Sequence, residues 1–366
     1  MKKINKNIAI VGCGRNAGHH IEAVKKNKDF HLTAVCDLNA ERAKNYSELF
    51  KVPFYTDYRD MLKNHPEISL VVLATPSGMH YEHSLEFISK FKKSIIVEKP
   101  TFMTPTQAKK IFHKADENKV KVYPVFQNRH NKAVKRVKEA IDDGELGDIR
   151  VTSVRVRWCR PQRYYDLSEW RGTFSHDGGA LTNQGIHHVD LLRYLGGEID
   201  EVNCSMATLG ADIEVEDSVV ANFKYKNGGI GSLEVTTAAR PDDFEASISI
   251  IGSKGLAQIG GIAVNILDIF TPDPVECEKF SDDFSDLSDR GRIYGRGHRD
   301  IYNQINNDLN FSLEYSPSYN DSLNTLNLLH AFYVSNETKK WINLSEELES
   351  ENLGKSNEKI SNLYRI

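Results

Sequence analysis

The sequence predicts an α/β fold in which a parallel sheet is followed by a second domain of α+β type. Within the first 125 residues, short β-branched runs alternate with helical stretches, which is the pattern of βαβ units in a parallel sheet. After residue 148 the predicted strands are longer and alternate apolar with polar residues, as half-solvated antiparallel strands do. This change of pattern indicates two domains.

Five short strands are predicted in the first domain, over residues 7–12, 31–37, 69–74, 94–98 and 120–125. Helices are predicted directly after Arg15, Asn39, Gly78 and Thr104. A further predicted helix over residues 131–141 is followed by a glycine- and acid-rich break at residues 142–148. We place the domain boundary between residues 128 and 129.

The second domain continues with strands predicted over residues 149–158, 202–209, 217–225, 230–237 and 245–251. Asn227 and Gly228 predict a hairpin turn between two of them. Residues 272–292 are rich in Asp, Glu and Ser, which predicts an exposed loop. The last helices are predicted over residues 299–309 and 319–335.

Composition argues against several classes of function. The 366 residues carry a formal charge of −4 and are 40% hydrophobic, which is typical of a soluble globular protein. Lys and Arg are scattered among Asp and Glu, so no basic surface for nucleic acid or an anionic membrane is predicted. The five cysteines form no metal-ligand spacing. We therefore expect a cytoplasmic protein with reduced thiols, no metal site, no secretory signal and no membrane span.

A glycine-rich turn lies where the first predicted strand meets the first helix. Gly12 permits a tight turn, Gly14 lets a pyrophosphate approach the backbone, and the small Ala17 allows close helix packing. The helix start, which includes Arg15 and Asn16, would present its amide groups to the phosphates. The pattern predicts a dinucleotide site, and a glycine turn without a ligand is the alternative.

Asp37 ends the second predicted strand, about twenty residues after the glycines. A carboxylate at this place accepts hydrogen bonds from the adenosine ribose and repels a 2'-phosphate. The sequence therefore favours NAD over NADP as the cofactor, although Arg42 on the next helix would suit NADP. A simple helix cap is the alternative role for Asp37.

Two further strand ends carry candidate cofactor residues. These residues are Thr75, Pro76, Glu98 and Lys99. Open parallel sheets bind ligands at the carboxyl ends of their strands, so we expect these residues to border the nicotinamide half of the cofactor. His80 is also a candidate cofactor residue, although an exposed helical face would explain both His80 and His83.

Residues 177–190 have the strongest catalytic pattern. Two glycines precede an amide, Asn183, and a histidine, His187, which are four residues apart. On one α-helix this spacing places both side chains on the same face, where they can act on one bound molecule. A packed helix histidine is the alternative for His187.

Four ordered motifs resemble those of the Gfo/Idh/MocA family of nicotinamide-dependent sugar oxidoreductases. They are Gly12-x-Gly14-x-x-Ala17, Ala74-Thr75-Pro76, Glu98-Lys99-Pro100 and Gly185-x-His187-x-x-Asp190. Residues 157–165, 170–173 and 183–188 resemble a narrower group within the family, the UDP-N-acetylglucosaminuronate 3-dehydrogenases.

The family resemblance implies a Rossmann domain over residues 1–128. Over residues 129–366 it implies a substrate-binding and oligomerisation domain with a large open, mainly antiparallel sheet. It further implies that NAD accepts hydride while His187 takes the hydroxyl proton and Lys99 polarises the oxygen. Many family members carry aspartate where this chain has Asn183. Because an amide cannot take up a proton, we expect Asn183 to orient the substrate or Lys99.

The narrower resemblance implies oxidation at C3 of UDP-N-acetylglucosaminuronate by a dimer or tetramer, for bacterial surface polysaccharide such as the O-antigen of lipopolysaccharide. It also implies 2-oxoglutarate as the oxidant that recycles the cofactor. A nucleotide uronate carries about three negative charges and needs cations. The expected substrate-binding residues are Arg160, Arg163, Tyr164, Tyr165, Asn183 and His187. Arg157 and Arg171 are further candidates, although a solvated sheet face would explain Arg155 and Arg157.

Two alternative functions stay open. A related dehydrogenase or reductase could act on another sugar or on an inositol, because pocket shape rather than motif sets substrate choice. A non-catalytic NAD-binding sensor would keep the glycine turn and Asp37 but would not need Lys99 and His187. The presence of both Lys99 and His187 favours an enzyme.

Overall fold

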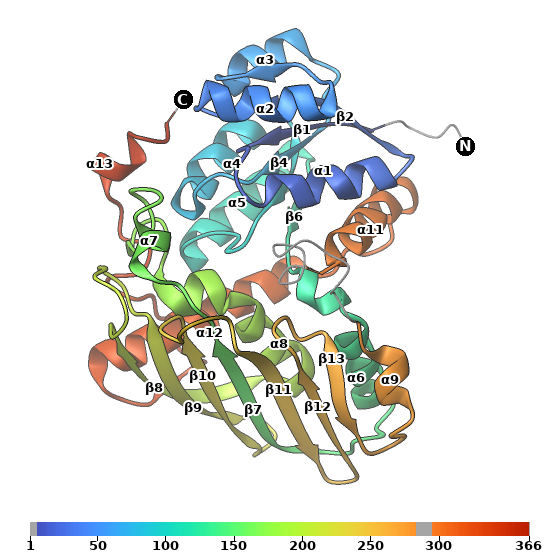
Figure 1. Ribbon diagram of the computed structural model, residues 1–366, viewed down its shortest axis with the longest axis vertical. Coiled ribbons are helices and arrows are strands. Elements are labelled where there is room, and N and C mark those ends of the chain that lie inside the picture. The colour runs from blue at the N-terminus through green and yellow to red at the C-terminus, as the bar shows by residue number, and fades with distance from the viewer. Residues whose placement is uncertain (1–5, 283–294, 366) are drawn as a thin grey trace. The chain divides into compact units, whose positions relative to one another are not determined.

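The computed structural model describes residues 6–282 and 295–365 and divides into two compact units (Figure 1). The first unit comprises Met1–Val125, His298–Leu323 and Ser356–Ile366, and the second comprises Phe126–Gly297 and Asn324–Lys355. The chain thus leaves the first unit twice and returns to it twice. No helix in the described ranges is both long and apolar enough to cross a membrane.

The first unit contains a six-stranded parallel sheet in the order β3-β2-β1-β4-β5-β6. Its strands are β1 (Lys6–Val11), β2 (Phe30–Cys36), β3 (Phe54–Tyr55), β4 (Leu70–Leu73), β5 (Ser94–Val97) and β6 (Val122–Pro124). Its helices are α1 (Ala17–Lys26), α2 (Ala40–Phe50), α3 (Tyr58–Asn64), α4 (His80–Ser89), α5 (Pro105–Asn118), α11 (Gly297–Phe311) and α13 (Glu358–Ser361). The five predicted strands are confirmed, whereas β3 and α3 were not predicted.

Burial explains why the central strands are apolar along their whole length. All four residues of β4 are buried, and Ile8 and Ile10 of β1 pack with Ile21 of α1 and Tyr302 of α11 in one core cluster. Strands covered by helices on both faces require such continuous apolar runs. The strand order reverses its direction of growth between β1 and β4, and open sheets bind ligands at the carboxyl ends next to that point.

The second unit contains an eight-stranded sheet in the order β13-β12-β11-β7-β10-β9-β8-β14. Its strands are β7 (Ile149–Arg157), β8 (Ile199–Ala207), β9 (Ser218–Tyr225), β10 (Ile230–Thr236), β11 (Glu245–Gly252), β12 (Leu256–Gly260), β13 (Ile266–Phe270) and β14 (Ile342–Asn343). Strand β7 runs parallel to β10, and the other neighbouring pairs in the described sheet are antiparallel. The predicted α/β class with a mainly antiparallel second sheet is confirmed.

The two faces of this sheet differ in burial. Val154 of β7 pairs with Leu233 and Ile248 on its two neighbours, and all three are buried on the face towards α8 (Ile186–Gly196). On the opposite face the guanidinium of Arg157 pairs with Glu234 and Glu245, with Nε 2.6 Å from Glu234 Oε1. Arg157 therefore lies on the sheet face away from α8 and is already paired with two carboxylates, as the alternative of a sheet-face arginine predicts.

The remaining elements of the second unit are helical. They are α6 (Lys132–Asp142), α7 (Gln162–Tyr165), α9 (Glu276–Phe280) and the larger part of α12 (Tyr319–Thr338). Over residues 272–292 we predicted an exposed loop; residues Glu276–Phe280 form the short helix α9 instead, but none of its residues is buried. Residues 283–292 of that loop lie outside the described residues.

Candidate functional site

The glycine turn joins β1 to α1 in the first unit. Gly12 has a φ of +96° and packs on the end of β4, where a Cβ would lie 2.4 Å from the carbonyl oxygen of Ala74. Gly14 faces open space, because a Cβ there would meet no described atom within 4 Å. Ala17 is fully buried at the start of α1. The turn therefore leaves room at Gly14 for a pyrophosphate beside the helix amides.

Asp37 directly follows β2, and its carboxylate lies against the glycine turn. Oδ2 accepts a hydrogen bond from the backbone amide of Cys13 at 2.8 Å, and Oδ1 accepts one from the amide of Asn39 at 2.8 Å. The guanidinium of Arg42 lies 3.4 Å from Oδ2. The side chain of Asn39 caps α2, so the alternative of Asp37 as that cap is wrong. Each carboxylate oxygen keeps a lone pair for a ribose hydroxyl.

Glu98 is buried at the carboxyl end of β5. Its Oε1 accepts a hydrogen bond from His20 Nε2 at 2.9 Å and lies 3.4 Å from His298 Nε2. Its Oε2 accepts hydrogen bonds from the side-chain amide of Asn16 and the backbone amide of Lys99, both at 3.2 Å. Burial works to raise the pKa of Glu98, but the bonds from both histidines hold it well below its ordinary value. An anionic Glu98 therefore ties α1 to the backbone of Lys99.

His20, Glu98 and His298 form the one group of described residues whose ligand atoms could hold a metal ion, since these atoms lie within 4.8 Å of one another. Burial lowers the pKa of His20, which keeps the ring neutral. A neutral ring with its proton on Nε2 donates to Glu98 and accepts a bond at Nδ1 from the Tyr302 hydroxyl at 3.0 Å. These hydrogen bonds explain the cluster as a support for Glu98.

Thr75, Pro76 and His80 follow β4. His80 is fully buried, with Nδ1 2.9 Å from the carbonyl oxygen of Pro100 and Nε2 3.1 Å from that of Thr75. Burial lowers the pKa of both His80 and His83, that of His83 to about 4. The exposed helical face considered for these two histidines is wrong, because both rings fill space behind the strand ends. His80 therefore bridges the loop that contains Thr75 and the loop that contains Pro100.

Asn183 and His187 lie on two different elements of the second unit. Residues Ala180–Gln184 form a single π-helical turn, in which the amide of Gly185 donates to the Ala180 carbonyl at 2.8 Å, and α8 begins after it. The prediction of one α-helix through both residues is therefore wrong. Gly185 packs closely, since a Cβ there would lie 2.8 Å from the carbonyl oxygen of Leu181. Isolated π turns occur frequently at functional sites.

Both side chains of this pair are nearly buried. His187 is 5% exposed, and the ring of Phe126 meets its ring edge-on at 6.0 Å. Asn183 is 7% exposed and donates a hydrogen bond to the carboxylate of Asp177. Asp190, one turn further along α8, forms a buried ion pair with Arg129, whose Nε lies 2.7 Å from Asp190 Oδ2. Asp190 therefore has a structural role.

Arg171 and Tyr164 form an aromatic and cationic cluster beside the π turn. The guanidinium of Arg171 lies over the rings of Tyr164 and Trp170, at 4.3 and 4.6 Å from their centroids, and donates to the Tyr164 hydroxyl. The side-chain amide of Gln184, from the π turn, donates to the same hydroxyl at 3.2 Å. Within the described ranges no carboxylate pairs with Arg171, and its buried Nε makes no hydrogen bond. The cluster therefore holds an uncompensated positive charge.

The other predicted substrate residues differ in their surroundings. Arg160 is already paired, with its NH1 2.7 Å from Asp243 Oδ1. Arg163 is exposed on α7. Tyr165 is buried, its hydroxyl lies 3.0 Å from Thr237 Oγ1, and burial raises its pKa. Of this set, Tyr164 is thus the residue that contacts the uncompensated cation.

Glu216 was not predicted as part of any site. It precedes β9 and is buried, and burial raises its pKa to about 8. Its Oε1 accepts a hydrogen bond from the backbone amide of Leu181 at 3.0 Å and lies 2.7 Å from the hydroxyl oxygen of Tyr333. The sequence carries no signal for this role, because an acid before a strand is ordinarily solvated.

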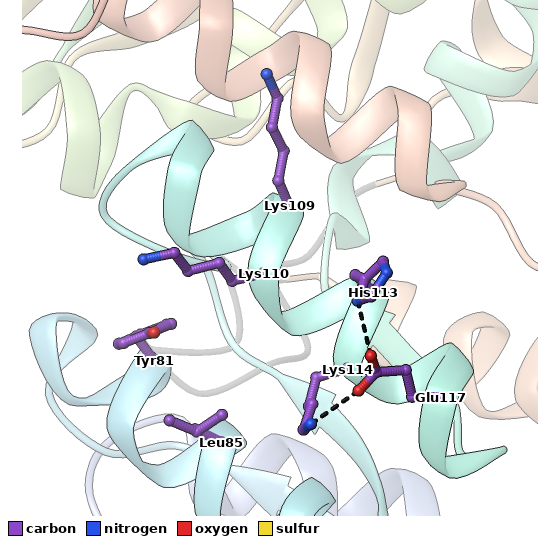
Figure 2. A pocket seen from close by; sticks show the side chains of 7 residues that line it. All are labelled: Tyr81, Leu85, Lys109, Lys110, His113, Lys114 and Glu117. Atoms are coloured by element: carbon purple, nitrogen blue, oxygen red, sulfur yellow. Dashed lines mark hydrogen bonds and ion pairs between the residues drawn. The ribbon is translucent and has the colours of Figure 1, made fainter.

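A surface hollow lies between α4 and α5 in the first unit (Figure 2). It has a volume of about 450 Å³ and is lined by Tyr81, Leu85, Lys109, Lys110, His113, Lys114 and Glu117. Lys114 and His113 both pair with Glu117, at 2.8 and 3.4 Å. None of the predicted site residues lines it, so the hollow is separate from the strand ends described above.

Two family models match this chain. Residues 6–126 match an oxidoreductase family model described as an NAD-binding Rossmann fold, and residues 134–258 match the GFO/IDH/MocA C-terminal domain. The glycine turn, Asp37, Lys99 and His187 all lie inside these two segments.

Solved structures are similar over nearly the whole chain. One is the WlbA dehydrogenase from Bordetella pertussis in complex with NADH and UDP-GlcNAcA, with 34% identity, a TM-score of 0.84, and coverage of 94% of this chain and 99% of that one. The WlbA dehydrogenase from Chromobacterium violaceum, in complex with the same two molecules, has 32% identity, a TM-score of 0.84, and coverage of 94% and 97%. Among curated proteins, the D-glucoside 3-dehydrogenase of Escherichia coli is 29% identical over 276 residues, which is 69% of this chain and 76% of that protein.

Proposed function

Because the chain belongs to the GFO/IDH/MocA family of NAD-dependent sugar and polyol oxidoreductases, we propose that it oxidises the C3 hydroxyl of UDP-N-acetylglucosaminuronate. The observation that carries this proposal is the likeness, over 94% of the chain, to two dehydrogenases solved with NADH and UDP-GlcNAcA. The uncompensated cation at Arg171 supports an anionic substrate. The product is the 3-keto sugar nucleotide.

The residues of the first unit fit NAD. Open space at Gly14 suits the pyrophosphate, and the carboxylate of Asp37 suits the two hydroxyls of the adenosine ribose. Bound NAD supplies the hydride acceptor. Asn16 is held by Glu98 at the start of α1, next to the amides that would meet the phosphates. We assign Thr75, Pro76 and Lys99 to the nicotinamide half.

We assign the proton chemistry to two residues. His187 accepts the proton of the C3 hydroxyl as the general base. Lys99 donates a hydrogen bond to the same oxygen and stabilises the negative charge that develops on it. Asn183 orients the substrate, because its amide donates and accepts hydrogen bonds but cannot take up a proton.

The test measures formation of the 3-keto sugar nucleotide by mass spectrometry, at constant protein concentration, from UDP-N-acetylglucosaminuronate, with UDP-N-acetylglucosamine as the matched substrate that lacks the carboxylate. We expect turnover with the uronate, increased by 2-oxoglutarate if this compound recycles bound NADH, and a much lower kcat/KM with the matched sugar. Absence of turnover with the uronate under both conditions would remove this substrate from the proposal.

The second candidate is a dehydrogenase of a simple sugar. The 29% identity to the D-glucoside 3-dehydrogenase favours it, because the name of that protein gives a glucoside as the substrate. Turnover of a free glucoside with a higher kcat/KM than the nucleotide uronate would establish it. A protein that binds NAD but oxidises neither substrate would instead fit the sensor hypothesis.

Asp37→Ala tests the cofactor half of the proposal. We expect NAD binding to weaken by about 10-fold, which corresponds to loss of one or two hydrogen bonds from a charged group. The preference for NAD over NADP should narrow at the same time, because the carboxylate no longer repels a 2'-phosphate. Titration of both cofactors by quenching of intrinsic fluorescence measures this. Unchanged affinity for NAD would exclude Asp37 from the site.

Arg171→Met tests whether Arg171 binds the anionic substrate. Loss of a charge-assisted hydrogen bond should raise the KM for the uronate by about 10- to 100-fold while kcat changes little. The matched control is Arg150→Met, which removes the same charge from an exposed position on β7. Steady-state kinetics of both variants measure the effect. Equal KM values for the two variants would contradict the assignment.

The proposal extends to assembly and pathway. Val151, Ile230 and Ile251 form a row across the outer face of the second sheet and are 39%, 55% and 46% exposed. We assign this face to contact with a second copy of the chain in a dimer or tetramer, because adjacent exposed apolar residues mark interaction surfaces. We place the reaction in the synthesis of bacterial surface polysaccharide.

A further inference from the structure

One acidic residue, Glu216, binds the start of the π turn that carries Asn183. The amide of Ala180 donates to the backbone carbonyl of Glu216 at 3.0 Å, and the amide of Leu181 donates to its carboxyl group at 3.0 Å. These are the first amides of the turn, which have no partner within it. Both oxygens of the carboxyl also lie against Gly179, where a Cβ would be only 2.2 Å from Oε2. Glu216 therefore fixes the start of the turn through backbone and side chain together.

The hydrogen bonds around Tyr333 indicate the protonation state of this acid. The Tyr333 hydroxyl contacts three oxygens: the Gly178 carbonyl, Glu216 Oε1 and Thr182 Oγ1. The carbonyl can only accept, and a phenol has one proton to donate. If Glu216 were ionised, it would compete with the carbonyl for that single proton. A protonated Glu216 donates to the phenol instead, and the phenol then donates to Gly178.

The surroundings disfavour a negative charge at the same place. Glu216 is 5% exposed, and its Oε2 has no hydrogen-bond partner among the described atoms. Among the described residues, the titratable groups that interact electrostatically with Glu216 include Asp177, Tyr333 and Cys204. None of these carries a positive charge. Burial, with a smaller contribution from Asp177, raises the pKa of Glu216 to about 8.

We infer that Glu216 is a positioning residue that holds the Asn183 turn in its protonated form, and that its ionisation releases the turn and sets an alkaline limit to turnover. Asp177 links the ionisation of Glu216 to the position of Asn183, because it accepts the hydrogen bond from Asn183 and repels an ionised Glu216. The alkaline limit to turnover rests on the proposed role of Asn183 in orienting the substrate. The protonation state of Glu216 does not depend on that role.

The kinetic test compares pH profiles of kcat for wild type, Glu216→Gln and Thr182→Val. Wild type should lose activity as the pH rises through about 8. Glu216→Gln should keep neutral activity within about 10-fold, since it loses one neutral hydrogen bond, and should lack the alkaline loss. Thr182→Val also removes a hydrogen bond to Tyr333 but leaves the acid, so its alkaline loss should remain. Identical profiles for wild type and Glu216→Gln would overturn the inference.

Two further readouts need no substrate. A protonated carboxyl has an infrared C=O stretch that a carboxylate lacks, and this band should be present near neutral pH in wild type and absent in Glu216→Gln. An acid whose pKa is raised on folding stabilises the fold below about pH 4.5 and loses this contribution as the pH rises through about 8. The Tm of wild type should therefore fall more steeply over that range than the Tm of Glu216→Gln. If Glu216→Gln does not fold, Glu216→Asp assigns the band by its shift. A spectrum without the band at neutral pH contradicts the inference even if the enzyme turns over as proposed.

Discussion

Lys99→Met is expected to lower kcat by about 100- to 1000-fold, the usual cost of removing one donor that stabilises a developing oxyanion. The carboxylate of Glu98 accepts a hydrogen bond from the backbone amide of Lys99 at 3.2 Å. Because this bond does not involve the Lys99 side chain, the substitution should leave the strand end in place. Methionine keeps most of the side-chain volume and removes only the ammonium group. The affinity for NAD should therefore stay close to that of wild type.

The matched control for this variant is Lys110→Met, at an exposed position on α5 in the same unit. It makes the same change of charge away from the strand ends, and we expect wild-type kcat. Stopped-flow measurement of NADH formation separates the chemical step from product release. A Lys99→Met enzyme that forms NADH in the first turnover as fast as wild type would exclude Lys99 from the reaction.

His187→Asn is expected to lower kcat by about 100- to 10,000-fold, which is the usual range for loss of a general base. The amide of asparagine has a similar shape to part of the imidazole but cannot take the hydroxyl proton. His187 packs against Phe126 in the first turn of α8, so the fold should tolerate the smaller side chain. Substrate binding should change much less than turnover.

The control for His187 is His113→Asn, which replaces an exposed histidine of α5 that pairs with Glu117. If His187 were merely a packed histidine, His187→Asn would lower the Tm but leave kcat near that of wild type. Measuring Tm and kcat on both variants therefore distinguishes the catalytic from the packing role.

The cofactor half could be predicted from the sequence because each of its features answers a local requirement. Gly12 needs a positive φ and has no room for a Cβ, and Asp37 must end a strand to reach the glycine turn. Buried parallel strands need continuous apolar runs, so β1 and β4 could also be predicted from the sequence. The two-residue strand β3 is too short to leave such a pattern.

The substrate half was harder to predict because its geometry depends on contacts between distant residues. The π turn arises where Gly178 and Gly179 adopt positive φ and Glu216, thirty-odd residues later, caps the first amides. A spacing of four residues predicts an α-helical face and contains no information on that cap. The burial of His80 likewise follows from carbonyl groups of Thr75 and Pro100 that the sequence alone does not bring together.

The sequence also could not show which of the candidate arginines is paired with a carboxylate. Arg160 and Arg171 each follow a tryptophan closely along the chain, yet the first is paired with Asp243 while the second lies on two aromatic rings without a described carboxylate partner. Strand pairing places Asp243 beside Cys159, whose amide also donates to it at 2.7 Å. The return of residues 298–323 to the first unit supplies His298 and Tyr302 behind Glu98, which again is a long-range contact.

The central claim is that hydride passes from C3 of the sugar nucleotide to NAD. It is tested most directly with UDP-N-acetylglucosaminuronate deuterated at C3, followed by mass spectrometry of the NADH that forms. Transfer from C3 predicts one deuterium in NADH and a slower first turnover than with the unlabelled substrate. Unlabelled NADH formed at an unchanged rate would contradict it.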